Sequence, residues 1–320
     1  MMADLPYIDD QALTHRPTWQ GVVDAIIAGH NRPKARIADN LLGRADQKLL
    51  NRAAWIDGLG SAVKSVTVYP DNPKGGDGLP SVQGACLVFD DKSGTPKAMI
   101  DSKLLTFWKT AADSVLGALL VGPKDPDHLV IVGAGVVAQS LAAAYTALLP
   151  NLSHITICAR RLEAAENLIN RLDLDGVDVH ASDRPQQGVT EGDIIATATT
   201  SATPVLNSKW IKAGAHIDLV GAYTPTMREA DTDTLKRGAL YVDSRDTTLD
   251  HIGDLKTPLE QGDIERDDVL GDFYDLVPVN TQARPMNGKE ITVFKNGGGA
   301  HLDLMVSRYL LDLFEGQAPH

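Results

Sequence analysis

The stretch 129–161 contains the residues whose types and spacing most clearly predict chemistry. It reads LVIV, GAGVVAQS, an amphipathic run and HITICARR. Gly133 and Gly135 permit a tight turn and a close approach of backbone to a ligand, and Ala138 takes the small third position of the G-x-G-x-x-G/A pattern. A strand before this pattern and a helix after it predict a βαβ unit that binds a dinucleotide pyrophosphate and serves hydride transfer. The residues expected to contact this cofactor are Gly133, Ala134, Gly135, Val136 and Val137.

The end of the second strand of this unit bears on which dinucleotide binds. NAD sites place an acid there for the ribose 2′-OH, but this chain has Ala159 followed by Arg160 and Arg161. Arginine matches a 2′-phosphate by charge and by its fork of donors, so the sequence favours NADPH. NADH stays possible because Glu163 follows closely and could reach the ribose. The alternative interpretation is that the two arginines are solvated residues at the start of a helix.

Two lysines in apolar surroundings are candidates for binding an anion. Lys64 alternates with Ala62 and Val66 in AVKSVTVY, and a lysine on an apolar strand face is costly unless it is paired or functional. The alternative is that the opposite face is the core, or that Lys64 extends outward from a sheet edge. Lys109 borders the apolar face of the segment LLTFWKTAADSVLGALL, near Asp113, and on spacing alone it is a helix-border lysine.

The segment 296–299 is a glycine-rich turn before the last apolar helix. It reads NGGG, which leaves the amide donors of the helix accessible. Asp303 falls in the first turn, where a carboxylate interacts favourably with the helix dipole. Its default role is therefore capping, and a catalytic role is the alternative. The histidines have no ligand spacing, and we expect no metal site.

Composition narrows the classes of partner. The net charge is −12, which argues against nucleic acid and anionic membranes, so an anionic substrate must meet a local basic cluster. The two cysteines lie in apolar runs and predict no disulfide framework. The first residues lack the pattern of a signal peptide, and the most apolar stretch carries Lys109 and Asp113, so we expect a cytoplasmic protein with no membrane span.

The order of the elements predicts an α/β protein with two domains. Strands and helices alternate after residue 128, which predicts a doubly wound, mostly parallel Rossmann sheet in residues 122–290. Residues 1–121 with 291–320 are expected to form a smaller α+β domain from both chain ends, onto which the last helix returns.

The motifs together resemble those of the ornithine cyclodeaminase/mu-crystallin family. The matching pieces are AVKSVTVYPDN (62–72), LPSVQGACLVFD (79–90), LLTFWKTAADSVLGA (104–118), VIVGAGVVAQS (130–140), DIIATATTSATPVL (193–206), HIDLVGAYTPTMREAD (216–231) and ITVFKNGGGAHLDL (291–304). The resemblance implies that the smaller domain binds substrate and pairs its strands in a homodimer. It also implies substrate contacts by Lys64, Lys109 and Arg36, with Arg32 and Lys34 as competitors of Arg36. The cofactor contacts that it adds are Thr197, Ala198, Thr199, Val220 and Gly221.

Two departures from the family pattern decide between its reactions. Lys109 stands where the family has a carboxylate-binding arginine, which keeps the charge and loses the fork. Tyr223 stands where the cyclodeaminase has an aspartate that acts on the substrate amine. The resemblance therefore favours NAD(P)H-dependent reduction of a small imino acid such as Δ1-pyrroline-2-carboxylate, with Lys64, Lys109 and Asp303 as catalytic candidates. The alternatives are ornithine cyclodeamination with bound NAD, and NADPH-dependent ligand binding without turnover.

Overall fold

The structure is a computed structural model that describes residues 5–72, 78–278 and 290–317. It divides into two compact units. Unit 1 comprises residues 1–109 and 299–320, and unit 2 comprises residues 110–298. The first boundary falls inside helix α2 (Ser102–Val121).

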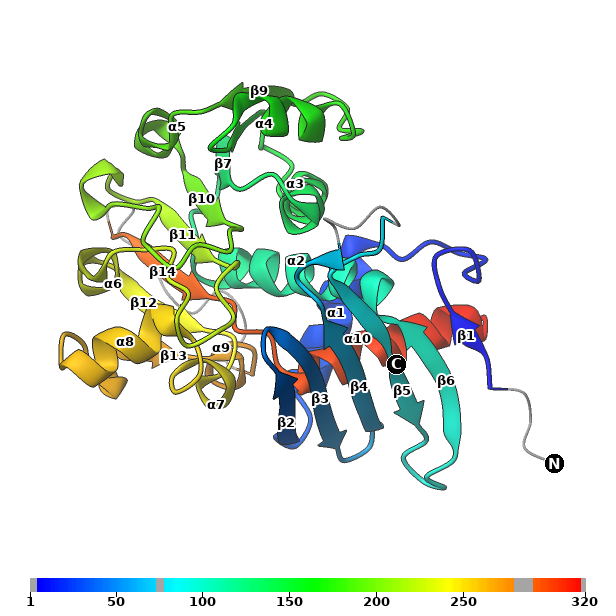
Figure 1. Cartoon of the computed structure of the whole chain (residues 1–320). Coiled ribbons are helices and arrows are strands. Elements are labelled where there is room, and N and C mark those ends of the chain that lie inside the picture. The colour runs from blue at the N-terminus through cyan, green and yellow to red at the C-terminus, as the bar shows by residue number, and fades with distance from the viewer. Residues whose placement is uncertain (1–4, 73–77, 279–289, 318–320) are drawn as a thin grey trace. The chain divides into compact units, whose positions relative to one another are not determined.

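Unit 1 is built on a six-stranded sheet in the order β1-β6-β5-β4-β3-β2 (Figure 1). Its neighbours are antiparallel except for the parallel pair β1 and β6. Burial along β4 alternates residue by residue, as expected for a strand with one covered face. The strands are β1 (Tyr7–Ile8), β2 (Arg36–Arg44), β3 (Gln47–Ile56), β4 (Gly60–Val68), β5 (Val82–Phe89) and β6 (Pro96–Asp101).

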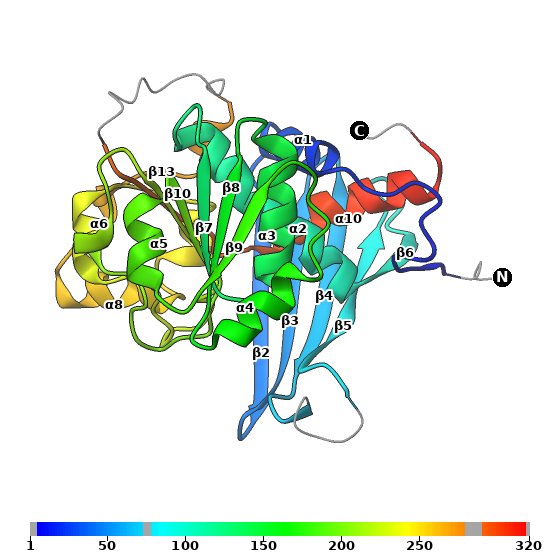
Figure 2. The same ribbon diagram turned by 90° about the horizontal axis from the view of Figure 1, so that it is seen from above.

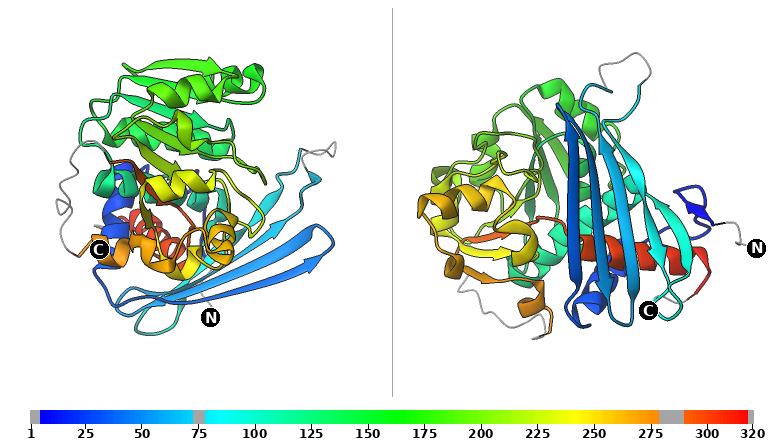
Figure 3. Two further views of the ribbon diagram at one scale, coloured as in Figure 1. Left: turned by 90° about the vertical axis from the view of Figure 1, so that its left-hand side faces the viewer. Right: turned by 60° about the horizontal axis from the view of Figure 1, so that its bottom comes forward.

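Helix α10 (Ala300–Phe314) crosses one face of this sheet and contacts β2 to β6 (Figure 3). Its side chains are buried almost throughout, so it is the core helix of unit 1. Helix α1 (Trp19–His30) packs on α10, and Thr18 caps it by accepting a hydrogen bond from Gly21 N. The return of the last helix to the sheet of unit 1 confirms the sequence-based expectation.

Unit 2 contains an eight-stranded parallel sheet in the order β13-β12-β14-β11-β10-β7-β8-β9. The strands are β7 (His128–Val132), β8 (His154–Cys158), β9 (Asp178–Ser182), β10 (Ile194–Thr197), β11 (His216–Leu219), β12 (Ala239–Val242), β13 (Val269–Gly271) and β14 (Thr292–Lys295). The helices are α3 (Val136–Leu148), α4 (Leu162–Ile169), α5 (Pro185–Glu191), α6 (Thr232–Arg237), α7 (Arg245–Thr248), α8 (Gly253–Gln261) and α9 (Phe273–Leu276). The central strands β10, β11 and β14 are buried at every residue because both faces of the sheet are covered, although β11 and β14 also carry buried polar residues.

The strand order reverses between β7 and β10. The chain runs from β7 outward to β8 and β9, and β10 then pairs with the other side of β7. Helices α3 and α4 lie on one face of the sheet and α5 and α6 on the other (Figure 2). This is a doubly wound α/β fold, as expected, and such folds bind ligands at the carboxyl ends of the strands beside the reversal.

Two segments lie outside the unit that the sequence suggested for them. Residues 110–121 and 291–298 belong to unit 2. Strand β14 is completely buried and pairs in parallel with both β11 and β12. A short apolar sequence is compatible with a strand in either sheet, so only the pairing register shows which sheet the strand joins.

Among the described residues, α2 alone has the length and hydropathy of a membrane span. Of the window that meets this criterion, 67% is buried inside the protein.

Candidate functional site

The turn between β7 and α3 shows why its glycines are needed. Gly133 has a φ of +138°, and a Cβ there would lie 2.4 Å from the carbonyl oxygen of Ala198. Gly135 is the N-cap of α3, where no side chain makes a capping bond and where a Cβ would meet nothing within 4 Å. The first amides of α3 are therefore left for a ligand, and the residues present fit a dinucleotide pyrophosphate.

The loops that follow β10 and β11 meet at the same edge of the sheet. Ala198 N donates to Val132 O at 2.8 Å, and Val220 N and Gly221 N donate to Thr197 O at 3.0 and 3.1 Å. The structure thus brings the predicted cofactor contacts of three loops together. They are Gly133, Ala134, Gly135, Val136 and Val137 after β7, Thr197, Ala198 and Thr199 around the end of β10, and Val220 and Gly221 after β11.

Arg160 and Arg161 follow β8 and are both exposed. Within the part of the chain that the structure describes, no carboxylate forms an ion pair with either guanidinium. Glu163 lies in the first turn of α4 and is also exposed. The end of β8 therefore presents the two arginines to solvent beside the dinucleotide turn. The carboxylate of Glu163 lies two positions after Arg161 in the sequence.

Lys64 and Asp303 form a buried ion pair in unit 1. Lys64 Nζ donates to Asp303 Oδ1 at 2.9 Å, and the side chains are 11% and 2% exposed. Burial alone would raise the pKa of Asp303, but Lys64, Lys109 and Arg52 hold it below its ordinary value. Asp303 Oδ2 is buried and has no hydrogen-bond partner among the described residues. The pair thus leaves one anionic oxygen for a donor on a ligand.

A cluster of cations surrounds this carboxylate. Arg52 on β3 lies directly opposite Lys64 on β4, so the two share a sheet face. Lys109 on α2 is only 5% exposed. The positive charges of Lys109, Arg52 and Lys34 also lower the pKa of His301. Burial together with these positive charges lowers the pKa of His301 well below its ordinary value, so the ring is neutral. We call Lys34, Arg52, Lys64 and Lys109 the cationic cluster.

Arg36 does not belong to the cationic cluster. Its Cα partner on β3 is Trp55, three residues from Arg52, which places Arg36 on the opposite face of the sheet from Lys64. Its side chain is 72% exposed, and its guanidinium pairs with Asp57 at 3.0 Å. The structure therefore does not bring Arg36 to the cluster as the sequence analysis expected. Arg52, which that analysis did not name because strand register decides the face, lies there instead and also pairs with Asp39 at 2.8 Å.

Other reactive groups near the cluster do not extend the chemistry. Burial raises the pKa of Cys86 to about 12, so its thiol is protonated although Cys86 lies opposite Lys64 on β5. Burial lowers the pKa of His30 to about 4, and its Nδ1 lies 2.8 Å from Ile26 O. Among the described residues no group of His, Cys, Asp or Glu is arranged to hold a metal ion.

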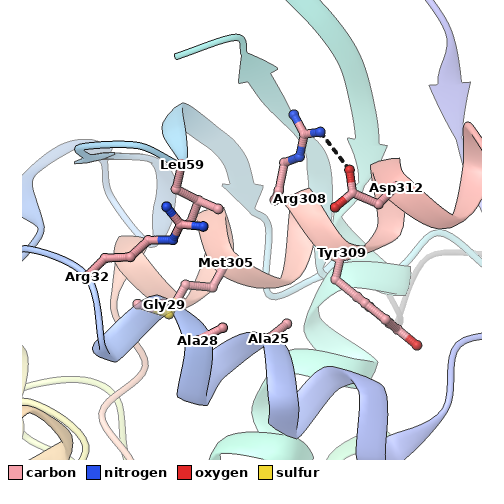
Figure 4. Close-up of a pocket in the computed structure, with 9 residues that line it drawn as sticks. All are labelled: Ala25, Ala28, Gly29, Arg32, Leu59, Met305, Arg308, Tyr309 and Asp312. Atoms are coloured by element: carbon pink, nitrogen blue, oxygen red, sulfur yellow. Dashed lines mark ion pairs between the residues drawn. The ribbon is translucent and has the colours of Figure 1, made fainter. Parts of the chain in front are cut away.

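A separate pocket in unit 1 lies between α1 and α10 (Figure 4). Ala25, Ala28 and Gly29 line one side, and Arg308 and Asp312 form an ion pair at 2.7 Å on the other. Its cavity volume of about 10 Å³ suffices for roughly one water molecule. It is therefore too small for a substrate.

Residues 56–317 match the pattern of the Ornithine cyclodeaminase/mu-crystallin family, and the chain belongs to this family. It is 47% identical over 303 residues to Delta(1)-pyrroline-2-carboxylate reductase of Paracoccus denitrificans, with 95% of each chain covered. It is 34% identical over 249 residues to ketimine reductase mu-crystallin of Mus musculus, covering 78% of this chain and 74% of that protein.

The fold is also similar to a solved structure with bound ligands. This is Delta(1)-pyrroline-2-carboxylate reductase of Thermococcus litoralis in complex with NADH and L-proline. The TM-score is 0.87 at 26% sequence identity, and the alignment covers 98% of this chain and 99% of that one.

Proposed function

We propose that this protein is an NAD(P)H-dependent reductase of a small cyclic imino acid, converting Δ1-pyrroline-2-carboxylate or a close ketimine to the amino acid. The cationic cluster carries the proposal, because three of its members act on one buried carboxylate, Asp303, and the fourth, Lys34, acts on the neighbouring His301, in a chain of net charge −12. Such a cluster suits a substrate carboxylate. The dinucleotide turn and the relative that binds NADH and L-proline support the cofactor and substrate class.

The residues of unit 1 have distinct roles in this proposal. Lys109 and Arg52 bind the substrate carboxylate and so fix the orientation of the C=N bond. Bound NAD(P)H supplies the hydride that the imine carbon accepts. Lys64 donates the proton that the nitrogen gains, since the lowered pKa keeps Asp303 ionised and unable to act as the acid. Asp303 holds Lys64 by the bond to Oδ1 and accepts a hydrogen bond from the product nitrogen at Oδ2.

Two other functions of the family remain to be separated by assay. Ornithine cyclodeamination would release ammonia without net consumption of cofactor, and a binding protein would retain NADPH and ligand without turnover. Tyr223 is 57% exposed and supplies no carboxylate at the position of the lyase aspartate, which favours reduction. The test is NAD(P)H oxidation with a panel of cyclic imino acids, alongside ammonia release from ornithine.

Arg160→Ala is expected to weaken NADPH binding much more than NADH binding. The arginine follows β8, where the ribose 2′ position falls in this fold, and Ala159 offers no acid. Loss of one charge-assisted contact to phosphate should cost about 1.5–3 kcal/mol. Fluorescence titration of both cofactors measures the effect, with Arg171→Ala at a second arginine of unit 2 as the control. Equal affinities in the parent that stay equal in the variant would reject the NADPH preference.

We also propose that two copies pair through the uncovered face of the unit 1 sheet. Ala53, Val63, Leu87 and Met99 lie in one row across β3 to β6 on the face opposite α10, and Val63 is 39% exposed. Such an apolar row favours burial against another protein surface. Both cysteines are free and buried. Because free thiols are typical of the reducing cytoplasm, we propose that the dimer is cytoplasmic.

Val63→Glu is expected to convert the dimer to a monomer, because it puts an unpaired charge in the middle of this row. Light scattering after size exclusion measures the mass. Leu270→Glu, at a 43% exposed leucine on β13 of unit 2, should leave the mass of the parent unchanged. A dimer that survives Val63→Glu, or a parent that is already monomeric, would rule out this interface.

A further inference from the structure

The carboxylate of Glu229 joins two of the loops at the carboxyl edge of the unit 2 sheet. Glu229 is fully buried, and its Oε1 accepts hydrogen bonds from Thr199 N at 2.7 Å and Thr199 Oγ1 at 2.8 Å. Its Oε2 accepts from Gly221 N at 2.6 Å and Ala222 N at 3.0 Å. One side chain therefore satisfies four donors, two from the loop after β10 and two from the loop after β11.

The surroundings hold this carboxylate in place. Glu229 N donates to Asp254 Oδ1 at 2.7 Å, and Lys295 Nζ lies 3.5 Å from Asp254 Oδ2 and donates to Leu219 O at 2.8 Å. The loops also pack without spare room, since a Cβ on Gly221 would lie 2.1 Å from Thr199 O. The distance between the two loops is thus set by Glu229 and by backbone contact.

These loops face one half of the dinucleotide. In a doubly wound fold the adenosine ribose lies at the end of the second strand, here β8, and the pyrophosphate lies over the helix after the first strand, here α3. The cofactor crosses the point where the strand order reverses, so its nicotinamide half must extend over β10 and β11.

We infer that Glu229 is a positioning residue for the nicotinamide half of the cofactor, fixing the loops after β10 and β11 without touching the cofactor itself. This inference rests on the proposed function only in requiring that the chain bind NAD(P)H. Nothing in it depends on the substrate or on the direction of the reaction.

Glu229→Gln tests the inference with almost no change in shape. The glutamine amide keeps one acceptor oxygen, which can still bind the two donors of one loop. Its NH₂ group replaces the second oxygen and would face the two donors of the other loop, which must then move. We expect the Kd of NADH and of NADPH to rise about tenfold or more, which is about 1.4 kcal/mol or more. The Kd of ADP, which carries the adenosine and the pyrophosphate but no nicotinamide riboside, should stay within about twofold. The KM of the imino acid should change less than the KM of the cofactor.

Asp231→Asn is the matched control. Asp231 also accepts bonds from backbone, at Ser208 N and Thr234 N, but its side chain caps α6 and makes no bond to Thr199, Gly221 or Ala222. Asp231→Asn should lower thermal stability, and any change in Kd should be the same for NADH and for ADP. If Glu229→Gln does not fold, Thr199→Val removes the Oγ1 hydroxyl, which donates to Glu229 and also accepts from Ser201 N at 3.3 Å. This variant should weaken NADH, but not ADP, by a smaller factor.

The outcomes are distinguishable. A parent that binds neither ADP nor NADH would overturn the proposed function, and the inference with it. A parent that binds both would leave that function in place, and the inference would then fail if the variants lose ADP and NADH equally or lose neither.

Discussion

Lys64→Met is expected to lower kcat for imino-acid reduction by about 100-fold or more, while the Kd of NADH changes little. The substitution removes the ammonium that donates the proton, and a positioned acid contributes on the order of 10²–10⁴ to a rate. The cofactor residues lie in unit 2, whereas Lys64 lies on β4 of unit 1. Steady-state kinetics with titration of NADH measures both quantities.

The control for this variant is Lys48→Met, which removes an exposed lysine from the neighbouring strand β3. It should keep the kcat of the parent. A Lys64→Met enzyme with unchanged kcat would show that the proton comes from another source. Loss of NADH binding together with kcat would instead indicate general misfolding, because breaking a buried ion pair costs about 3–5 kcal/mol.

The stability of the Lys64→Met variant should also depend on pH in a defined direction. The folded-state pKa of Asp303 is lowered, so its stabilisation is present above its unfolded pKa and is lost as pH falls through the folded value. Removing Lys64 takes away the largest charge that lowers this pKa, so the folded value moves toward the unfolded one. The loss of stability on acidification should therefore be smaller in the variant and complete at higher pH. Thermal unfolding at a series of acid pH values compares the two proteins.

Lys109→Ala is expected to raise the KM for the imino acid about tenfold or more, with a smaller effect on kcat. Lys109 is buried among the groups that act on Asp303 and His301, and a carboxylate contact serves the ground state and the transition state alike. Arg52→Ala should act in the same direction. Initial rates over a range of substrate concentrations separate KM from kcat.

Arg36→Ala provides the comparison within the same sheet. Its guanidinium is exposed on the face opposite Lys64, so KM should stay within about twofold of the parent. A large rise in KM for Arg36→Ala, with none for Lys109→Ala, would contradict the placement of the substrate carboxylate in the cationic cluster.

The dinucleotide half of the site is the part that sequence predicts best. The spacing of Gly133, Gly135 and Ala138 depends on one local turn, and the apolar strands around it are recognisable one at a time. The substrate half depends on strand register. Arg36 and Arg52 are both arginines in strand-like segments, and only their pairing with Trp55 and Lys64 shows which one faces the cluster.

Contacts between distant segments account for the other differences. Strand β14 looks in sequence like a strand of either sheet, and its parallel pairing with β11 and β12 assigns it to unit 2. Glu229 gives no signal of its own in the segment TMREAD, because its four donors come from residues up to 30 positions away. Asp303 has the spacing of a helix-capping carboxylate, and its partner proves to be Lys64 of the sheet.

The most direct test of the central claim follows the hydride itself. NADH carrying deuterium at the transferred position of C4 is incubated with the protein and Δ1-pyrroline-2-carboxylate, and the product is analysed by mass spectrometry and NMR. The proposed function predicts proline with one deuterium at Cα for each cofactor oxidised, and no ammonia from ornithine in a parallel assay. Ammonia and proline formed from ornithine, without cofactor oxidation on any imino acid, would contradict it.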